Sequence, residues 1–129
     1  MWEATRHHGH ALEFVLAAPE ASDRHVQTLA MVYFYHASGG SFALDHGHTV
    51  PVGRPWVPGS ACDHLLVSLP YPWGPSLEDC PLPDGGHIRA LWLLPITKAE
   101  WPGNHGHQIL RKRRNVTLRR CRPHREKGR

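Results

Sequence analysis

The chain lacks most of the features that mark membrane proteins, secreted proteins and disulfide-stabilised scaffolds. Its 129 residues contain no apolar run of about 18 residues, the length that a membrane-spanning helix needs. Residues 1–7 lack the apolar core of a signal peptide. Three cysteines (Cys62, Cys80 and Cys121) cannot all pair within the chain, and no CxxC spacing occurs. We therefore expect one domain, located in the reducing cytoplasm and outside any membrane.

The common catalytic and cofactor-binding motifs are also missing. The sequence has no HExxH zinc motif, no GxSxG nucleophile elbow, no phosphate loop and no dinucleotide fingerprint. His-Gly-His occurs three times, at residues 8–10, 46–48 and 105–107. An i, i+2 pair around glycine lacks the fixed spacing of helical ligands, so we favour solvated or hydrogen-bonding histidines over a metal site. Cys62, next to an apolar run, is typical of a small buried residue. We therefore expect no metal and no cofactor, with a histidine-dependent metalloenzyme as the less favoured alternative.

Charge divides the sequence into an acidic body and a basic end. Residues 111–129 carry ten Lys or Arg against one acidic residue, a net +9, whereas residues 1–110 carry five against ten, a net −5. The pI of about 9.3 therefore reflects the C-terminal segment alone. We expect residues 1–10 to be frayed, residues 11–107 to form the domain and residues 108–129 to be a disordered basic tail. This tail suits non-specific contact with nucleic acid, although it has no aromatic residue for base stacking.

Residues 22–38 give the clearest periodic pattern. Six apolar residues recur at helical spacing and form one predicted buried stripe: Val26, Leu29, Ala30, Tyr33, Phe34 and Ala37. Ser22 or Asp23 is positioned to cap the start, and Gly39-Gly40 supplies a left-handed stop. The sequence therefore predicts one main amphipathic helix.

Four further runs predict strands. They cover residues 11–17, 48–52, 64–69 and 88–96. Pro51 favours an edge position for the second, while the third and the second half of the fourth are apolar enough to be buried. Residues 71–86 are rich in proline and glycine and predict a loop, and Thr97 can cap a short helix to Glu100. We predict an α+β domain with a mixed or mostly antiparallel sheet, the main helix packed on it.

Residues 45–75 combine rigid proline- and glycine-rich loops with aromatic side chains. Trp56, Tyr71 and Trp73 lie there in proline-flanked settings, as Trp101 does further along the chain. Such rings suit either a protein-binding surface or the anchoring of the loops to their own core. Asp45 and Asp63 flank the central strand, where an aspartate commonly holds the backbone amides of a turn.

Several motifs in the same order resemble the suppressor-of-fused-like (SUFU) family in its bacterial branch. They are residues 25–30 (HVQTLA), 45–51 (DHGHTVP), 53–56 (GRPW), 59–64 (GSACDH), 65–72 (LLVSLPYP) and 91–100 (LWLLPITKAE). The likeness extends over about residues 11–108. The family has more chain before residue 11 and an acidic, apolar end, so this sequence looks truncated or frame-shifted at its C-terminus.

The resemblance implies a non-enzymatic α+β domain that acts as an immunity protein by binding a cognate polymorphic toxin in the cytoplasm. The acidic body suits a basic toxin domain. The predicted partner-binding residues are Asp45, His46, His48, Trp56, Asp63, Tyr71 and Trp73. The alternative is a nucleic-acid-binding protein that acts through the arginine-rich tail. The oligomeric state stays open.

Overall fold

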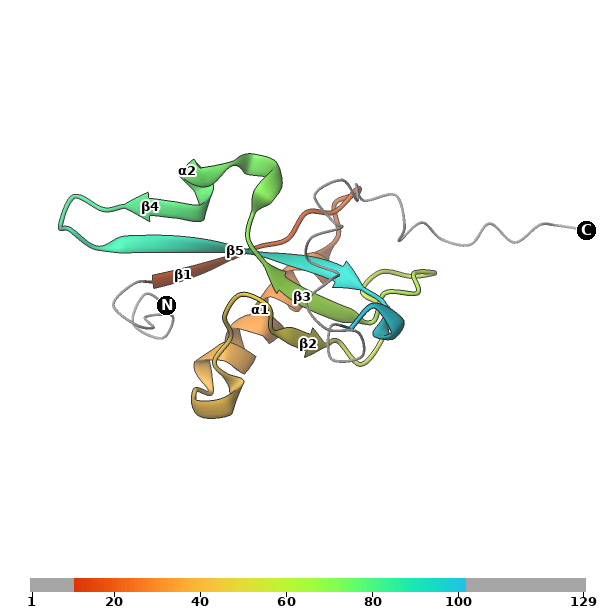
Figure 1. Cartoon of the computed structure of the whole chain (residues 1–129). Helices are drawn as coiled ribbons and strands as arrows, with labels where there is room; N and C mark the ends of the chain where they lie inside the picture. The colour runs from red at the N-terminus through yellow and green to blue at the C-terminus, as the bar shows by residue number, and fades with distance from the viewer. Residues whose placement is uncertain (1–10, 102–129) are drawn as a thin grey trace, which may run out of the picture. The chain divides into compact units, whose positions relative to one another are not determined.

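The computed structural model describes residues 11–101, so the predicted frayed N-terminus and basic tail lie outside the described residues (Figure 1). Along the described chain the order is β1 (Ala11–Val15), α1 (Asp23–Ala37), η1 (Gly40–Phe42), β2 (Thr49–Pro51), β3 (His64–Ser68), η2 (Tyr71–Trp73), α2 (Pro75–Glu78), β4 (Asp79–Pro81), β5 (His87–Ile96) and η3 (Lys98–Glu100), where η marks a 3₁₀ helix. These residues form two compact units. Unit 1 holds residues 11–48 and 67–94, and unit 2 holds residues 49–66 and 95–101.

The strands form a mixed sheet in the hydrogen-bonded order β1-β5-β3-β2, with β4 also on β5. In unit 1, β1 runs parallel to β5 from Ala11 opposite Ile88 onward, and β4 runs antiparallel to β5 with Cys80 opposite Ile88. In unit 2, β2 runs antiparallel to β3 with Val50 opposite Leu65. The predicted α+β class, the mixed sheet and the single main helix are confirmed.

Both predicted ends of the main helix are confirmed. Ser22 caps α1, and its Oγ accepts the backbone N–H of Arg24 at 3.3 Å. Asp23 follows in the first turn, where its negative charge suits the positive end of the helix dipole. After Ser38 the chain leaves the helix at Gly39, whose φ of +68° is one that glycine adopts without a Cβ clash.

The predicted buried stripe of α1 is wrong. Val26 and Phe34 are each 67% exposed, while the buried residues are Thr28, Val32 and His36. The Thr28 hydroxyl donates to the Arg24 carbonyl at 2.9 Å, and His36 Nδ1 accepts the Leu44 N–H at 2.8 Å. Because these hydrogen bonds are made inside the unit, burying a polar side chain there carries little penalty. The helix therefore turns a partly polar face inward.

Each unit has its own buried apolar residues. In unit 1 they are Ala11, Leu12, Val32, Leu44, Val67, Ala90, Leu91 and Leu93, and in unit 2 they are Val50, Trp56, Cys62, Leu65, Leu66 and Ile96. The prediction of a buried β3 is confirmed, as is that of a buried second half of β5. In unit 1, the ring of Phe14 on β1 meets the ring of His36 on α1 edge to face at 5.7 Å. This contact packs the helix on the sheet.

The prediction that residues 71–86 form only loop is wrong. They contain η2, the single helical turn α2 and the strand β4, which is hairpin-connected to β5. The Asp84-Gly85-Gly86 sequence does form a turn, because Leu82 N–H donates to Gly86 O at 2.7 Å and Gly86 N–H to Asp84 Oδ1 at 2.9 Å. A three-residue strand that ends in proline has too little alternation to be recognised from sequence.

Candidate partner-binding surface

The seven predicted partner-binding residues are divided between the two units. Unit 1 holds Asp45, His46, His48, Tyr71 and Trp73, whereas unit 2 holds Trp56 and Asp63. Each group is therefore considered within its own unit.

The loop that carries Asp45, His46 and His48 is tied to its own backbone. Asp45 Oδ1 accepts the His46 N–H at 2.7 Å, and His48 Nδ1 accepts the Asp45 N–H at 3.1 Å. Two backbone hydrogen bonds of Val67 hold the loop to β3. Gly47 N–H donates to Val67 O, and Val67 N–H donates to His48 O, both at 2.8 Å. The expected role of Asp45, in which the carboxylate holds a backbone amide of its own turn, is confirmed.

The polar atoms of this loop are only partly available to a partner. The carboxylate of Asp45 lies 3.7 Å from the guanidinium of Arg89 on β5, and its side chain is 48% exposed. His46 Nε2 is buried and has no hydrogen-bond partner among residues 11–101. His48 is exposed, but its Nδ1 is used within the loop. A partner at this loop would therefore meet the Asp45 carboxylate and the His48 ring edge.

Tyr71 and Trp73 are exposed on η2, at 51% and 42%. Trp73 meets the ring of Trp92 on β5 edge to face, at 5.5 Å and 85°. The backbone between them is fixed, since Trp73 N–H donates to Pro70 O at 3.0 Å and Gly74 follows with a φ of +79°. The Trp73 ring is thus held by Trp92, and Tyr71 lies exposed on the same fixed backbone turn, which agrees with the surface interpretation of these two residues.

Trp56 differs from these rings, because it is only 2% exposed. The backbone N–H of Trp56 donates to Cys62 O at 2.9 Å, and a second backbone bond joins Val52 N–H to Asp63 O at 2.9 Å. These bonds close the loop between β2 and β3 and turn the indole inward. The prediction of Trp56 as an exposed anchor for a partner is therefore wrong, and the alternative, that the ring fastens its own loop, is confirmed.

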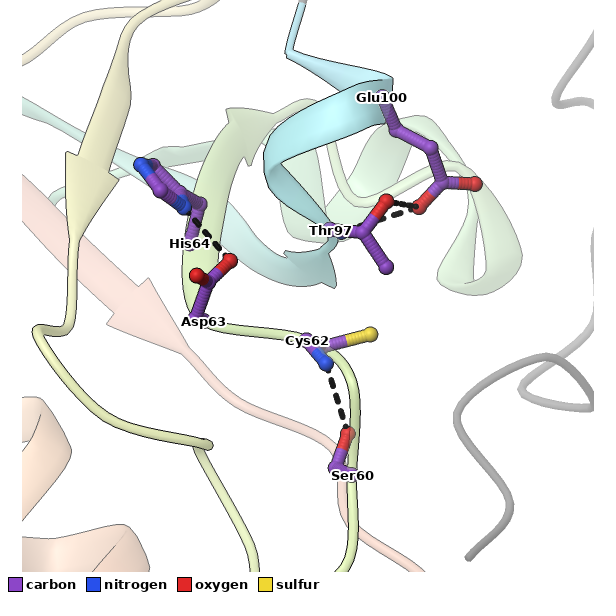
Figure 2. A network of polar contacts seen from close by, with 6 residues as sticks. All are labelled: Ser60, Cys62, Asp63, His64, Thr97 and Glu100. Carbon is purple, nitrogen blue, oxygen red and sulfur yellow. Dashed lines mark hydrogen bonds and ion pairs between the residues drawn. The ribbon is translucent and has the colours of Figure 1, made fainter. Parts of the chain in front are cut away.

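Asp63 belongs to a polar network of unit 2 (Figure 2). His64 Nδ1–H donates to its carboxylate at 2.8 Å, and the His64 ring stacks on Trp101 at 6.3 Å. The hydrogen bond from His64 holds the pKa of Asp63 below its ordinary value of 3.8. Attraction to the His64 ring and backbone N–H groups of Asp63 and Lys98 act in the same direction, against partial desolvation. The main partner of the Asp63 carboxylate is therefore the His64 ring.

The rest of the network in Figure 2 is also structural. Thr97 and Glu100 form a capping box at η3, with the Thr97 N–H donating to Glu100 Oε2 at 3.0 Å. Ser60 Oγ accepts the Cys62 N–H at 3.0 Å in the loop before β3. The predicted cap at Thr97 is confirmed. The Glu100 carboxylate and the Ser60 hydroxyl thus accept backbone N–H groups of their own unit.

Within residues 11–101 there is no group of three or more His, Cys, Asp or Glu side chains placed to hold a metal ion. The His-Gly-His pairs at residues 8–10 and 105–107 lie outside the described residues. Cys62 is buried, as predicted, whereas Cys80 on β4 is exposed. In the same range, no helix has the length and apolar composition needed to cross a membrane.

The net charge of the described residues lies entirely in unit 1. Its seven acidic residues face two arginines, a net −5, while unit 2 has two acidic and two basic residues and is neutral. Further along the same segment of unit 1, Leu77 on α2 is 36% exposed and Asp79 on β4 is exposed. The sequence analysis missed Leu77, Glu78 and Asp79. The available signal was the absence of any Lys or Arg between Val67 and Ile88.

These features define an α+β domain with the characteristics of a protein-interaction module: a rigid fold that displays aromatic rings and carboxylates. A family model described as suppressor of fused protein (SUFU) matches residues 2–113. A solved structure of a SUFU homologue from Neisseria gonorrhoeae FA 1090 is 38% identical, with a TM-score of 0.62. The alignment covers 74% of this chain and 50% of the homologue, so the chain spans half of that protein's length. No curated protein matches the chain.

The chain belongs to the suppressor of fused family. SUFU domains are protein-interaction modules and are generally regulatory or binding domains without enzymatic activity. The resemblance seen in the sequence motifs is thereby confirmed at the level of the family.

Proposed function

We propose that this chain is a non-catalytic immunity protein, which binds a cognate polymorphic toxin in the cytoplasm and neutralises it by occupying the toxin's surface. The observation that carries the proposal is the charge of unit 1, a net −5 among the described residues, together with the exposed rings of Tyr71 and Trp73. An acidic surface speeds association with a basic partner and disfavours acidic competitors. Rigid aromatic side chains provide contact area at a low entropic cost.

The predicted contact residues differ in how well their surroundings support such a role. Asp45, His48, Tyr71 and Trp73 expose polar or aromatic surface in unit 1. Asp63 retains 42% side-chain exposure, but its carboxylate is already engaged by His64. Trp56 is excluded by its burial, and the buried Nε2 of His46 makes that ring a weak candidate.

Neutralisation in cells tests this function. We expect the gene beside that of this chain to encode a large secreted toxin, whose C-terminal domain arrests growth when expressed alone in the cytoplasm. Co-expression of the full chain should restore growth, and the two proteins should co-purify as a stoichiometric complex. An unrelated toxin domain of similar charge serves as the control and should not be neutralised. If the folded chain is abundant and growth stays arrested, the proposal is overturned.

A further inference from the structure

We infer that the toxin is held by residues 69–86 of unit 1, through an arginine-bearing segment that stacks on Tyr71 and Trp73 and pairs with the neighbouring carboxylates. This inference rests on the proposed function and names the contact within it. We call these residues the η2–β4 segment, because they contain η2, α2 and β4.

The first argument is rigidity. Within this segment Pro70, Pro72 and Pro75 restrict the backbone, and Gly74 adopts a φ of +79° between η2 and α2. Backbone hydrogen bonds fix successive turns, including Leu77 N–H to Gly74 O at 3.3 Å. A surface that is already ordered loses little conformational entropy when a partner binds.

The second argument is that three large apolar or aromatic side chains are exposed within one short segment. Tyr71, Trp73 and Leu77 are 51%, 42% and 36% exposed, although each is large enough to be buried favourably. The Trp73 ring packs edge to face against the Trp92 ring, with the two ring centroids 5.5 Å apart. The Trp73 ring therefore keeps its position while part of its surface stays open to a partner.

The third argument is charge. The segment carries Glu78, Asp79 and Asp84 and not one Lys or Arg. Among residues 11–101, Glu78 has no hydrogen-bond or ion-pair partner, and Asp79 is 57% exposed, 3.1 Å from the ring nitrogen of His87. An aromatic face beside a carboxylate suits the guanidinium group, which stacks on a ring through its face and donates a fork of hydrogen bonds to a carboxylate. This combination selects an arginine over an apolar or acidic partner segment.

Binding of a defined peptide tests this contact with the full chain. The probe is a fluorescein-labelled peptide of six arginine-serine repeats, followed by fluorescence polarisation. A lysine-serine peptide of equal length and equal charge is the reference. We expect the arginine peptide to bind about three times more tightly than the lysine peptide, because guanidinium stacks better on aromatic rings.

Two charge-matched double variants separate a local contact from the general field of the acidic unit. Glu78→Lys with Asp79→Lys should weaken binding of the arginine peptide about tenfold, because it reverses the two carboxylates that directly follow Leu77 in the segment. Glu13→Lys with Glu20→Lys changes the charge of unit 1 equally, at exposed positions outside the segment, and should weaken binding less than about twofold. Tyr71→Ser should weaken it about three- to fivefold through loss of one stacking face. Equal weakening by both double variants would overturn the inference.

A spectroscopic readout keeps the inference testable if a variant folds poorly. In the unmodified chain, the indole N–H resonance of Trp73, assigned with Trp73→Phe, should shift on titration with the arginine peptide, while that of Trp56 should not. The reverse pattern contradicts the inference. If the Glu78→Lys/Asp79→Lys chain still neutralises the toxin, the function stands and this contact is wrong. If the peptide binds here but no toxin is neutralised, the contact stands and the function is wrong.

Discussion

The two units of this chain use similar residue types for opposite purposes. In unit 1, carboxylates outnumber arginines by seven to two, and Tyr71 and Trp73 are exposed. In unit 2, charge is balanced, Trp56 is buried, and Asp63 is engaged by His64. Aspartate and tryptophan residues thus stabilise the structure of unit 2, whereas residues of the same types in unit 1 remain available to a partner. Composition alone does not distinguish these roles, because they depend on whether each group finds a partner inside its own unit.

The largest expected effect concerns the face of α1 that unit 1 buries. Val32→Asp places a charge at a position that is 0% exposed, and should cost about 4 kcal/mol or more, enough to abolish cooperative folding. Val26→Asp on the same helix, at a position 67% exposed, should change the free energy of unfolding by no more than about 0.5 kcal/mol. Urea denaturation followed by circular dichroism measures both, and similar losses would contradict the assignment of the buried face.

A second pair compares one aromatic residue from each unit. Trp56→Ala should lower the free energy of unfolding by about 3–5 kcal/mol, because it leaves a cavity in unit 2. Tyr71→Ala should lower it by less than about 0.5 kcal/mol, because the ring is already half exposed. Thermal denaturation of the two variants measures and compares these losses of stability. A larger loss for Tyr71→Ala would mean that its ring, and not that of Trp56, is the structural one.

A smaller effect is expected at the cap of η3. Thr97→Ala removes the hydroxyl that contacts Glu100 Oε2 at 3.1 Å, and should cost about 1 kcal/mol. Thr49→Ala, at a half-buried threonine of β2 in the same unit, is a control for simple loss of a hydroxyl and should cost less. Chemical denaturation measures both variants, and an unchanged Thr97→Ala chain would show that the capping box does not stabilise unit 2.

The smallest effect concerns Asp63 and depends on pH. Because the pKa of Asp63 is lowered in the folded chain, its hydrogen bond with His64 stabilises the fold above pH 3.8, and this contribution is lost as the pH falls through the folded-state pKa. Asp63→Asn should therefore cost less than about 1 kcal/mol at pH 7, since water screens the partly exposed pair. Below pH 3.8 the difference between the two chains should shrink. If the difference in unfolding free energy between the two chains grew as the pH fell, the direction of the pKa shift of Asp63 would be contradicted.

The sequence predicted local features better than tertiary ones. The ends of α1 followed from Ser22 and Gly39, and the η3 cap from Thr97, because these signals act within a few residues. The inward face of α1 was not predictable, since Thr28 and His36 become buried only where Arg24 and Leu44 supply hydrogen bonds.

The candidate surface was predictable to a similar extent. Proline and glycine predicted loops around Tyr71 and Trp73, which lie on η2, and they predicted the same for Trp56. The burial of Trp56 depends on the pairing of its backbone with Cys62, which lies across the loop. Likewise, the position of Asp79 depends on the pairing of β4 with β5, and this pairing is too short to leave a sequence pattern.

Amide hydrogen–deuterium exchange of the full chain, with and without the neutralised toxin domain, tests the central claim most directly. The claim is that the partner is held by the η2–β4 segment of unit 1 and that the polar network of unit 2 serves the fold. The account predicts slower exchange on complex formation in residues 69–86 and unchanged exchange in residues 52–64. Protection confined to residues 52–64, with residues 69–86 unaffected, would contradict it.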